Sequence, residues 1–453
     1  MKWYSGSLEK LTNDWKLSEN ELWADYQVLG PMMSAYRVLA TMDDVFPIMV
    51  GAKGCSYHVR FAVVAMGEVD FDLGKRPAIT LEFTPTQVVT GNLTVRRSFT
   101  DRLMKIVGKK DPKLFVLVPT DEIIVSGIEL DDIERQIEEY TGITTTSIQA
   151  SNIMGQSPQA GYNPAMTALI KPFLGKYKGE RSGINLLGWH WPTRSNEREI
   201  GECLRMLEKV GVEVKTVLSG GSKLEDIQKA MTAKGNAVVC PAVCGDYVYD
   251  MEKDGIPMLS WRSPYGFSGT TEWLTEITTK LGLDRSKEIE ELENEYRYKF
   301  EENKVELKGK KIFISGGPGR LIGLLHLLND YEMDIDTAVL FYPHQNSQRD
   351  LKHLLDEHHL KVRNFIVSAS LYELEELATT IKFDVWAGGY QELHVCKKHH
   401  IPFVPITIYT VPHEGYAGAV NFGDKLRMAM QGFDFTESVF NAKELPECIQ
   451  LHK

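Results

Sequence analysis

The chain has 453 residues, 43% of them hydrophobic and 25% charged, which predicts about three globular units of roughly 150 residues each. The net charge of −11 argues against a nucleic-acid partner, because binding to a phosphate backbone needs a field of Lys and Arg. No apolar run approaches the roughly 18 residues of a membrane span, and no secretory signal is visible. Six scattered cysteines do not form a disulfide scaffold, so we expect a cytoplasmic protein in a reducing compartment.

The first predicted unit follows a polar arm, residues 1–28, that we expect to be irregular or helical. Residues 46–50 are an apolar run that ends in a Gly-rich turn, which predicts a buried strand, and a helix is expected from Cys55 to Met66. Alternating strands and helices are the βαβ pattern of a parallel sheet. The other elements predicted here are strands at 114–118 and 145–148 and an acidic helix at 131–140.

The same alternation begins again after a polar boundary at 176–181, and a third time after the charged stretch 284–308, which predicts a solvated helix and linker. The middle unit has predicted strands at 184–188, 212–217, 237–240 and 255–259 and helices at 197–210 and 224–232. The last has predicted strands at 311–315, 337–341, 361–367, 383–387 and 403–408 and a helix at 321–329. We therefore predict an α/β fold with three Rossmann-like domains, residues 1–179, 180–308 and 309–453, whose parallel sheets surround a central cavity.

A glycine-rich turn, Gly316-Gly-Pro-Gly-Arg-Leu-Ile-Gly323, follows the strand predicted at 311–315. A strand before it and a helix after it are the context of a dinucleotide fingerprint, in which glycines let backbone N–H groups approach a pyrophosphate. The spacing is imperfect, and Pro318 removes one N–H donor. We predict a tight strand-to-helix turn without tight NAD binding, and a nucleotide-binding Rossmann-type enzyme stays as an alternative.

Three cysteines are candidate ligands. Cys55 ends the turn after the first strand, where converging N–H groups can stabilise a thiolate or the sulfurs of a cluster; a buried, inert cysteine is the alternative. Cys240 and Cys244 are separated by three residues, unlike the two of the usual zinc or redox motif, and no second half-site is visible.

Histidines occur at three places of interest. His413 lies in a Gly-rich loop after the last predicted strand, and such loops hold ligands in open α/β sheets. The pairs His358-His359 and His399-His400 stand on polar stretches and are predicted to be surface residues.

The order of several short motifs resembles that of component 1 subunits of the nitrogenase superfamily, over nearly the whole chain. That superfamily includes the dinitrogenase subunits, a cofactor scaffold, and the light-independent protochlorophyllide and chlorophyllide reductases, which are nearest in outline. The motifs are Pro47-Ile-Met-Val-Gly-Ala-Lys-Gly-Cys-Ser-Tyr57, Gln87-Val-Val-Thr-Gly-Asn92, Ser126-Gly-Ile-Glu-Leu-Asp-Asp-Ile133, Gly155-Gln-Ser157 with Gly161-Tyr162, and Gly255-Ile-Pro257 with Pro264-Tyr-Gly266 and Gly269-Thr-Thr271.

The resemblance implies an iron–sulfur cluster at the interface of two homologous subunits. Cys55 matches one ligand position, while the positions near Gly30-Pro31 and Thr120-Asp121 carry no cysteine. A cluster needs about four ligands, usually thiolates. This chain would contribute Cys55 and the Asp121 carboxylate, and a partner would contribute most of the ligands.

The resemblance also implies a second site, in a cavity between the domains. Cys240 fits the position of a cofactor ligand, with Cys244 and His413 nearby, and the cavity would hold a metal cluster or a tetrapyrrole. The expected activity is that of a two-component reductase, whose partners are a homologous subunit, in a heterotetramer, and an ATP-dependent iron–sulfur reductase. A non-redox scaffold or structural partner is the alternative. Dinitrogen, a tetrapyrrole and a thioether all stay open as substrates.

Overall fold

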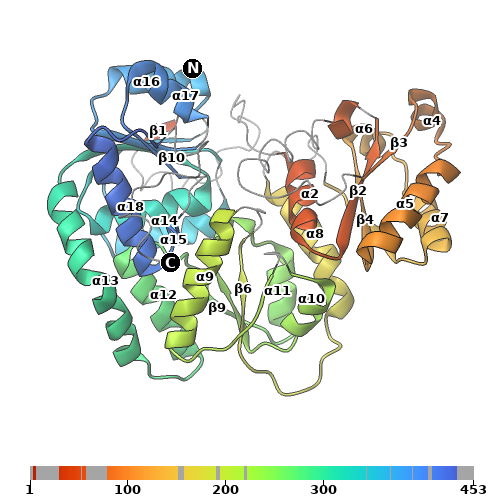
Figure 1. Ribbon diagram of the computed structural model, residues 1–453, viewed down its shortest axis with the longest axis horizontal. Helices are drawn as coiled ribbons and strands as arrows, with labels where there is room; N and C mark the ends of the chain where they lie inside the picture. The colour runs from red at the N-terminus through yellow and green to blue at the C-terminus, as the bar shows by residue number, and fades with distance from the viewer. Residues whose placement is uncertain are drawn as a thin grey trace.

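The computed structural model describes residues 4–6, 30–52, 54–57, 79–150, 158–189, 194–218, 222–342, 344–367, 369–389, 391–406 and 411–435. They form two four-stranded sheets and one six-stranded sheet, all flanked by helices. In Figure 1 the first sheet lies at the right, the second in the lower middle and the third at the left. Every strand pairing but one is parallel, which confirms the predicted α/β class.

The first sheet has the order β3-β2-β4-β5. Its central strands β2 and β4 are buried along their whole length, as expected of parallel strands covered on both faces. The strands are β3 (Ile79–Glu82), β2 (Val45–Gly51), β4 (Leu114–Pro119) and β5 (Thr145–Ser147). The helices are α2 (Pro31–Thr41), α4 (Pro85–Thr90), α5 (Arg97–Lys110), α6 (Asp121–Val125) and α7 (Asp131–Thr141). Residues 54–57 begin the helix expected after Cys55, and residues 58–66 lie outside the described residues.

The second sheet has the order β7-β6-β8-β9. Its strands are β6 (Ile184–Leu187), β7 (Val214–Val217), β8 (Gly235–Val238) and β9 (Met258–Ser260). Its helices are α8 (Gln159–Ile170), α9 (Arg194–Lys209), α10 (Leu224–Ala230), α11 (Asp246–Lys253) and α12 (Phe267–Lys280), with short turns η3 (Lys171–Phe173) and η4 (Pro241–Val243).

The third sheet has the order β1-β12-β11-β10-β13-β14. The N-terminal arm, expected to be irregular or helical, contributes strand β1 (Tyr4–Gly6), which pairs antiparallel with β12. An open sheet edge accepts an extended segment through main-chain bonds, which residue type does not reveal. The other strands are β10 (Lys311–Gly316), β11 (Asp334–Leu340), β12 (Val362–Val367), β13 (Val385–Gly388) and β14 (Phe403–Pro405). The helices are α14 (Pro318–Asp330), α15 (Gln345–Asp356), α16 (Leu371–Thr380), α17 (Glu392–His399) and α18 (Gly415–Met430).

The stretch predicted to be a solvated helix and linker is helix α13 (Ser286–Leu307), which packs along α18. Its sparse apolar stripe includes Ile289, Leu292 and Phe300, all buried. Phe300 stacks on Tyr331, with ring centroids 4.6 Å apart. The predicted helix is present and largely solvent-facing, but its dense charge pattern hid one apolar face that packs on the core.

Hydrophobic clusters cross between the sheets. One cluster runs from Met32 in α2 to Met258 in β9, and a larger one runs from Ile184 in β6 to Phe435. Apart from β1, each sheet falls within one of the three predicted domains, whose exact boundaries stay a prediction. Among the described residues, no helix combines the length and apolar character needed to cross a bilayer.

Candidate functional site

A buried carboxylate fixes the loop that carries His413. Glu199 projects from α9 and is fully buried. Its Oε1 accepts the backbone N–H of His413 at 3.1 Å, and its Oε2 accepts that of Glu414 at 2.8 Å. Glu414 is the N-cap of α18. The Glu199 carboxylate therefore sits at the start of this helix, where helical N–H groups lack partners and the helix dipole favours negative charge.

A second carboxyl group, Glu414, lies buried next to the first. Its Oε2 is 3.6 Å from the Sγ of Cys203, which also comes from α9. Burial and the neighbouring Glu199 raise the pKa of Glu414 well above its usual range, and Arg320 opposes this. Each buried carboxylate disfavours the ionised form of the other, so this surrounding favours proton uptake by Glu414.

His413 and Lys425 form the basic side of the same site. Both side chains are buried, and the Nζ of Lys425 lies 2.8 Å from the Nε2 of His413. Burial lowers the pKa of His413 well below its usual range, and Lys425 lowers it further. Burial also lowers the pKa of Lys425 to about 7, although Glu199 opposes the shift. A neutral His413 therefore accepts a hydrogen bond from a lysine that can release its proton near neutral pH.

Arg320 joins these groups to Cys240. It stands on α14, where its Nε donates to the Tyr265 hydroxyl at 3.3 Å and its Nη1 donates to the Ile406 carbonyl at 2.8 Å. Its charge acts on the pKa of Cys240, Glu414 and His413 alike. We call the residues gathered here the Arg320 cluster: Glu199, Cys203, Cys240, Tyr265, Arg320, His413, Glu414 and Lys425.

The two cysteines of the predicted pair have different surroundings. Cys240 is half-buried after β8, and burial raises the pKa of its thiol to about 12 while Arg320 opposes the shift. A Cβ added to Gly319, in the first turn of α14, would overlap the Cys240 sulfur. Cys244 is fully buried, with its Sγ 3.9 Å from the Tyr247 hydroxyl. The structure thus brings Cys240 and His413 to the Arg320 cluster, whereas the Cys244 sulfur contacts Tyr247.

The glycines after β10 serve packing inside the chain. Gly317 caps α14, Pro318 is its first residue, and a Cβ added to Gly323 would overlap the Tyr265 ring. Gly319 and Gly323 therefore let α14 approach Cys240 and Tyr265 closely. This accounts for the glycines as the predicted strand-to-helix turn, without a pyrophosphate.

Cys55 and Asp121 lie at the carboxyl ends of the neighbouring strands β2 and β4. Cys55 is exposed, and its pKa is raised by partial burial, by Glu122 and by Asp121. The Oε1 of Glu122 accepts the N–H of Ala52 at 2.5 Å. Carboxylates disfavour a thiolate, so the described part of this face, with one thiol, does not by itself meet the needs of an iron–sulfur cluster.

Glu199 and Glu414 were not predicted from the sequence, although α9 carried a usable signal. Its buried positions from residue 199 onward follow helical spacing, and glutamates occupy the first two of them. A carboxylate on the apolar stripe of a helix indicates a specific partner. The stripe consists of Glu199, Glu202, Cys203, Met206, Leu207 and Val210.

A sequence profile described as nitrogenase component 1 type oxidoreductase matches residues 30–431. The chain belongs to this family. The predicted resemblance is confirmed, and the chain is a member of an oxidoreductase family.

Relatives in this family cover most of the chain. A nitrogenase iron-molybdenum cofactor biosynthesis protein NifE from Clostridium pasteurianum is 26% identical over 415 residues, which span 87% of this chain and 85% of that protein. A nitrogenase molybdenum-iron protein alpha chain from Methanothermococcus thermolithotrophicus is 22% identical, over 84% of this chain and 81% of the relative. The solved structure of nitrogenase Cp1 at pH 6.5 matches with a TM-score of 0.74 at 17% identity, covering 94% and 95% of the two chains, which confirms the fold.

Proposed function

We propose that this chain is a subunit of a nitrogenase-like two-component reductase, and that the Arg320 cluster forms part of the wall of its cofactor or substrate site. One observation supports this most strongly: two carboxyls, a lysine and a histidine are buried together, and Arg320 and Glu414 both act on the pKa of Cys240. Burying an unpaired charged group costs several kcal/mol. The net stability of a whole domain is of similar size, so such groups are expected to be paired or to be retained for a function. Perturbed groups gathered in one place are a physical sign of such a site.

The residues of the cluster suit an anionic metal cofactor. Cys240 offers a sulfur ligand, whose proton would leave on metal binding because metals bind the thiolate. Arg320 supplies the positive charge beside it. When bound, a metal cofactor would supply electrons to the substrate. The chain's own groups then hold protons near it: Lys425 through His413, and the pair Glu199 and Glu414.

We further propose that electrons arrive through the face around Cys55, from an ATP-dependent iron–sulfur reductase. A homologous subunit would supply most ligands of an interface cluster, giving two copies of each chain. This proposal requires the partner to bring metal or positive charge to Cys55, because Glu122 and Asp121 disfavour a thiolate there.

The test uses the complex co-expressed with its homologous subunit and purified without oxygen. Cys240→Ala should lower the content of the cavity cofactor and abolish turnover, while Cys396→Ala, a buried cysteine on α17, serves as the matched control. Iron analysis and electron paramagnetic resonance give the readout. Normal iron, normal spectra and normal turnover in Cys240→Ala would overturn the proposal.

A second candidate is a cofactor scaffold, which the similarity to cofactor biosynthesis proteins named NifE favours. A scaffold would hold a metal cluster in the same place and release it to an acceptor protein. Radioactive iron transferred to an acceptor, without substrate reduction when the reductase and ATP are supplied, would favour this candidate over the first.

A further inference from the structure

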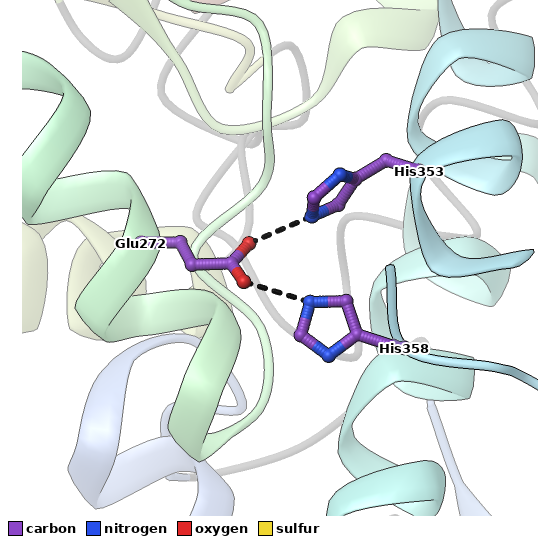
Figure 2. A group of neighbouring side chains, drawn as sticks. All are labelled: Glu272, His353 and His358. Carbon is purple, nitrogen blue, oxygen red and sulfur yellow. Dashed lines mark hydrogen bonds and ion pairs between the residues drawn. The ribbon is translucent and has the colours of Figure 1, made fainter. Parts of the chain in front are cut away.

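A second group of chemically active side chains lies away from the Arg320 cluster. Figure 2 shows Glu272, from α12, facing two imidazoles that come from α15 and from the residues just after it. Its Oε2 is 3.0 Å from the Nε2 of His353, and its Oε1 is 2.7 Å from the Nε2 of His358. The three candidate donor atoms all lie within 4.8 Å of one another. We call these three residues the histidine cluster.

The histidine cluster is sheltered. The exposed fractions of the side chains are 29% for Glu272, 20% for His353 and 16% for His358. His358 was predicted to be a surface residue, and it is half-buried. His353 stands in the last turn of α15 and His358 two residues beyond that helix, so the chain turns back at the helix end and brings His358 against α12 and α14.

Neighbouring residues hold the imidazoles in place. The ring of His358 meets the ring of His326, from α14, edge to face at 4.3 Å. The Nε2 of His326 lies 2.9 Å from the Ser268 hydroxyl, which donates to Asp330 at 2.6 Å. This ordering lowers the conformational entropy that a metal ion would otherwise have to overcome.

One cation competes for the carboxylate. Arg262 donates to the Oε2 of Glu272 at 2.5 Å, and its Nε lies 3.9 Å from the Oε2 of Glu276, one turn further along α12. Glu276 thus gives Arg262 a second carboxylate to pair with if Glu272 turns toward a metal. Asp350, half-buried on α15, adds another carboxyl that interacts with the same arginine.

We propose that the histidine cluster binds one divalent transition-metal ion of the zinc class, through the Nε2 atoms of His353 and His358 and the carboxylate of Glu272. Imidazole nitrogen and carboxylate oxygen are ligands that Zn²⁺ and Co²⁺ accept, and a water molecule completes a four-coordinate shell. The ion joins α12, which follows the second sheet, to the end of α15 in the third. This site is independent of the proposed redox function.

A pair elsewhere in the chain supplies the matched control. His399, on α17, contacts Glu375, on α16, with its Nε2 2.6 Å from Oε1. There the Nζ of Lys398 also lies 2.6 Å from the Oε1 of Glu375, where the histidine cluster has its second imidazole. This pair resembles half of the histidine cluster but lacks a second imidazole, so it should not bind a divalent ion.

The test uses the untagged full chain, freed of metal with a chelator. Zn²⁺ is titrated by calorimetry and Co²⁺ by visible absorption. We expect one ion per chain, and a Co²⁺ spectrum of nitrogen and oxygen ligation without the sulfur-to-metal band that Cys240 or Cys55 would give. Loss of a second-shell partner already weakens metal sites about 10- to 100-fold, so His353→Ala and Glu272→Gln should weaken binding by about 100-fold or more.

His399→Ala should bind as the unchanged protein does. At position 358 the variant is His358→Gln and not alanine, because glutamine keeps much of the volume that packs on His326. Circular dichroism checks that each variant is folded. The absence of a one-to-one Zn²⁺ complex in the unchanged protein would overturn the proposal. So would equal affinity in the folded His353→Ala and His399→Ala proteins.

Discussion

The Arg320 cluster and the face around Cys55 both carry a cysteine after a buried strand, yet they differ in what surrounds the sulfur. Burial raises the pKa of the half-buried Cys240, and the neighbouring Arg320 opposes that shift. Cys55 is exposed beside two carboxylates that raise its pKa. The charge of Arg320 thus counters the effect of burial on the first sulfur, whereas Glu122 and Asp121 add to the effect of burial on the second. Four predictions would break or sharpen this contrast.

The largest expected effect concerns Glu199. Glu199→Ala removes the acceptor of two buried N–H groups and a counter-charge for Lys425. Leaving a buried donor without an acceptor costs about 1–3 kcal/mol, so the loss of both acceptors should lower the unfolding free energy by about 2–6 kcal/mol. Urea denaturation measures this, with Glu208→Ala, an exposed carboxylate on the same helix, expected to change stability by less than about 0.5 kcal/mol. Equal effects of the two substitutions on the unfolding free energy would show that the buried contacts of Glu199 contribute no more than an exposed carboxylate does.

A smaller effect is expected at the contact between α14 and Cys240. Gly319→Ala pushes a methyl group into the Cys240 sulfur, and such overpacking costs about 1–3 kcal/mol. Cys240→Ala should restore most of that loss, because the atoms then nearest to the new methyl are 3.6 Å away. The double-mutant cycle measures the coupling. Gly201→Ala, on α9 with no atom near the added Cβ, is the control and should stabilise by about 0.5–1 kcal/mol. Additive effects at the two positions would contradict this packing.

The third prediction is a pH dependence. Burial lowers the pKa of Lys425 to about 7, from 10.5. Between these values the unfolded chain binds the proton and the folded chain does not, so this lysine makes stability rise with pH, by up to about 1.4 kcal/mol per unit. Below pH 7 both states are protonated and the slope from this group disappears. Unfolding free energies of the unchanged protein and Lys425→Met, measured between pH 7 and 10, give the difference in slope. Parallel curves would argue against a buried, uncharged lysine.

The smallest expected effect on stability is at Cys55. Cys55→Ala removes an exposed thiol and should change the unfolding free energy of the isolated chain by less than about 0.5 kcal/mol. In the complex with the homologous subunit, the same substitution should lower the interface iron and leave the cavity cofactor unchanged. Iron analysis of the complex measures this. Unchanged iron would make Cys55 an ordinary surface residue.

Local patterns in the sequence were enough to predict most of the strands. Two apolar runs that end at a glycine or proline, residues 46–50 and 114–118, form buried strands as predicted, because short apolar runs of this kind are typical of strands covered on both faces. The family motifs and the candidate cysteines could likewise be located from local patterns. The pairing of residues 4–6 with β12 could not, because main-chain bonds at a sheet edge leave no pattern in residue type.

The sequence by itself determined the α/β class and the three sheets. The tertiary structure alone decided which side chains of distant elements meet. Glu199 approaches His413 across more than 200 residues, and Glu272 meets two histidines from another helix. Such contacts depend on how helices cover neighbouring sheets. A helical repeat shows which face of a helix is buried, but it does not show which residue of another element lies opposite that face.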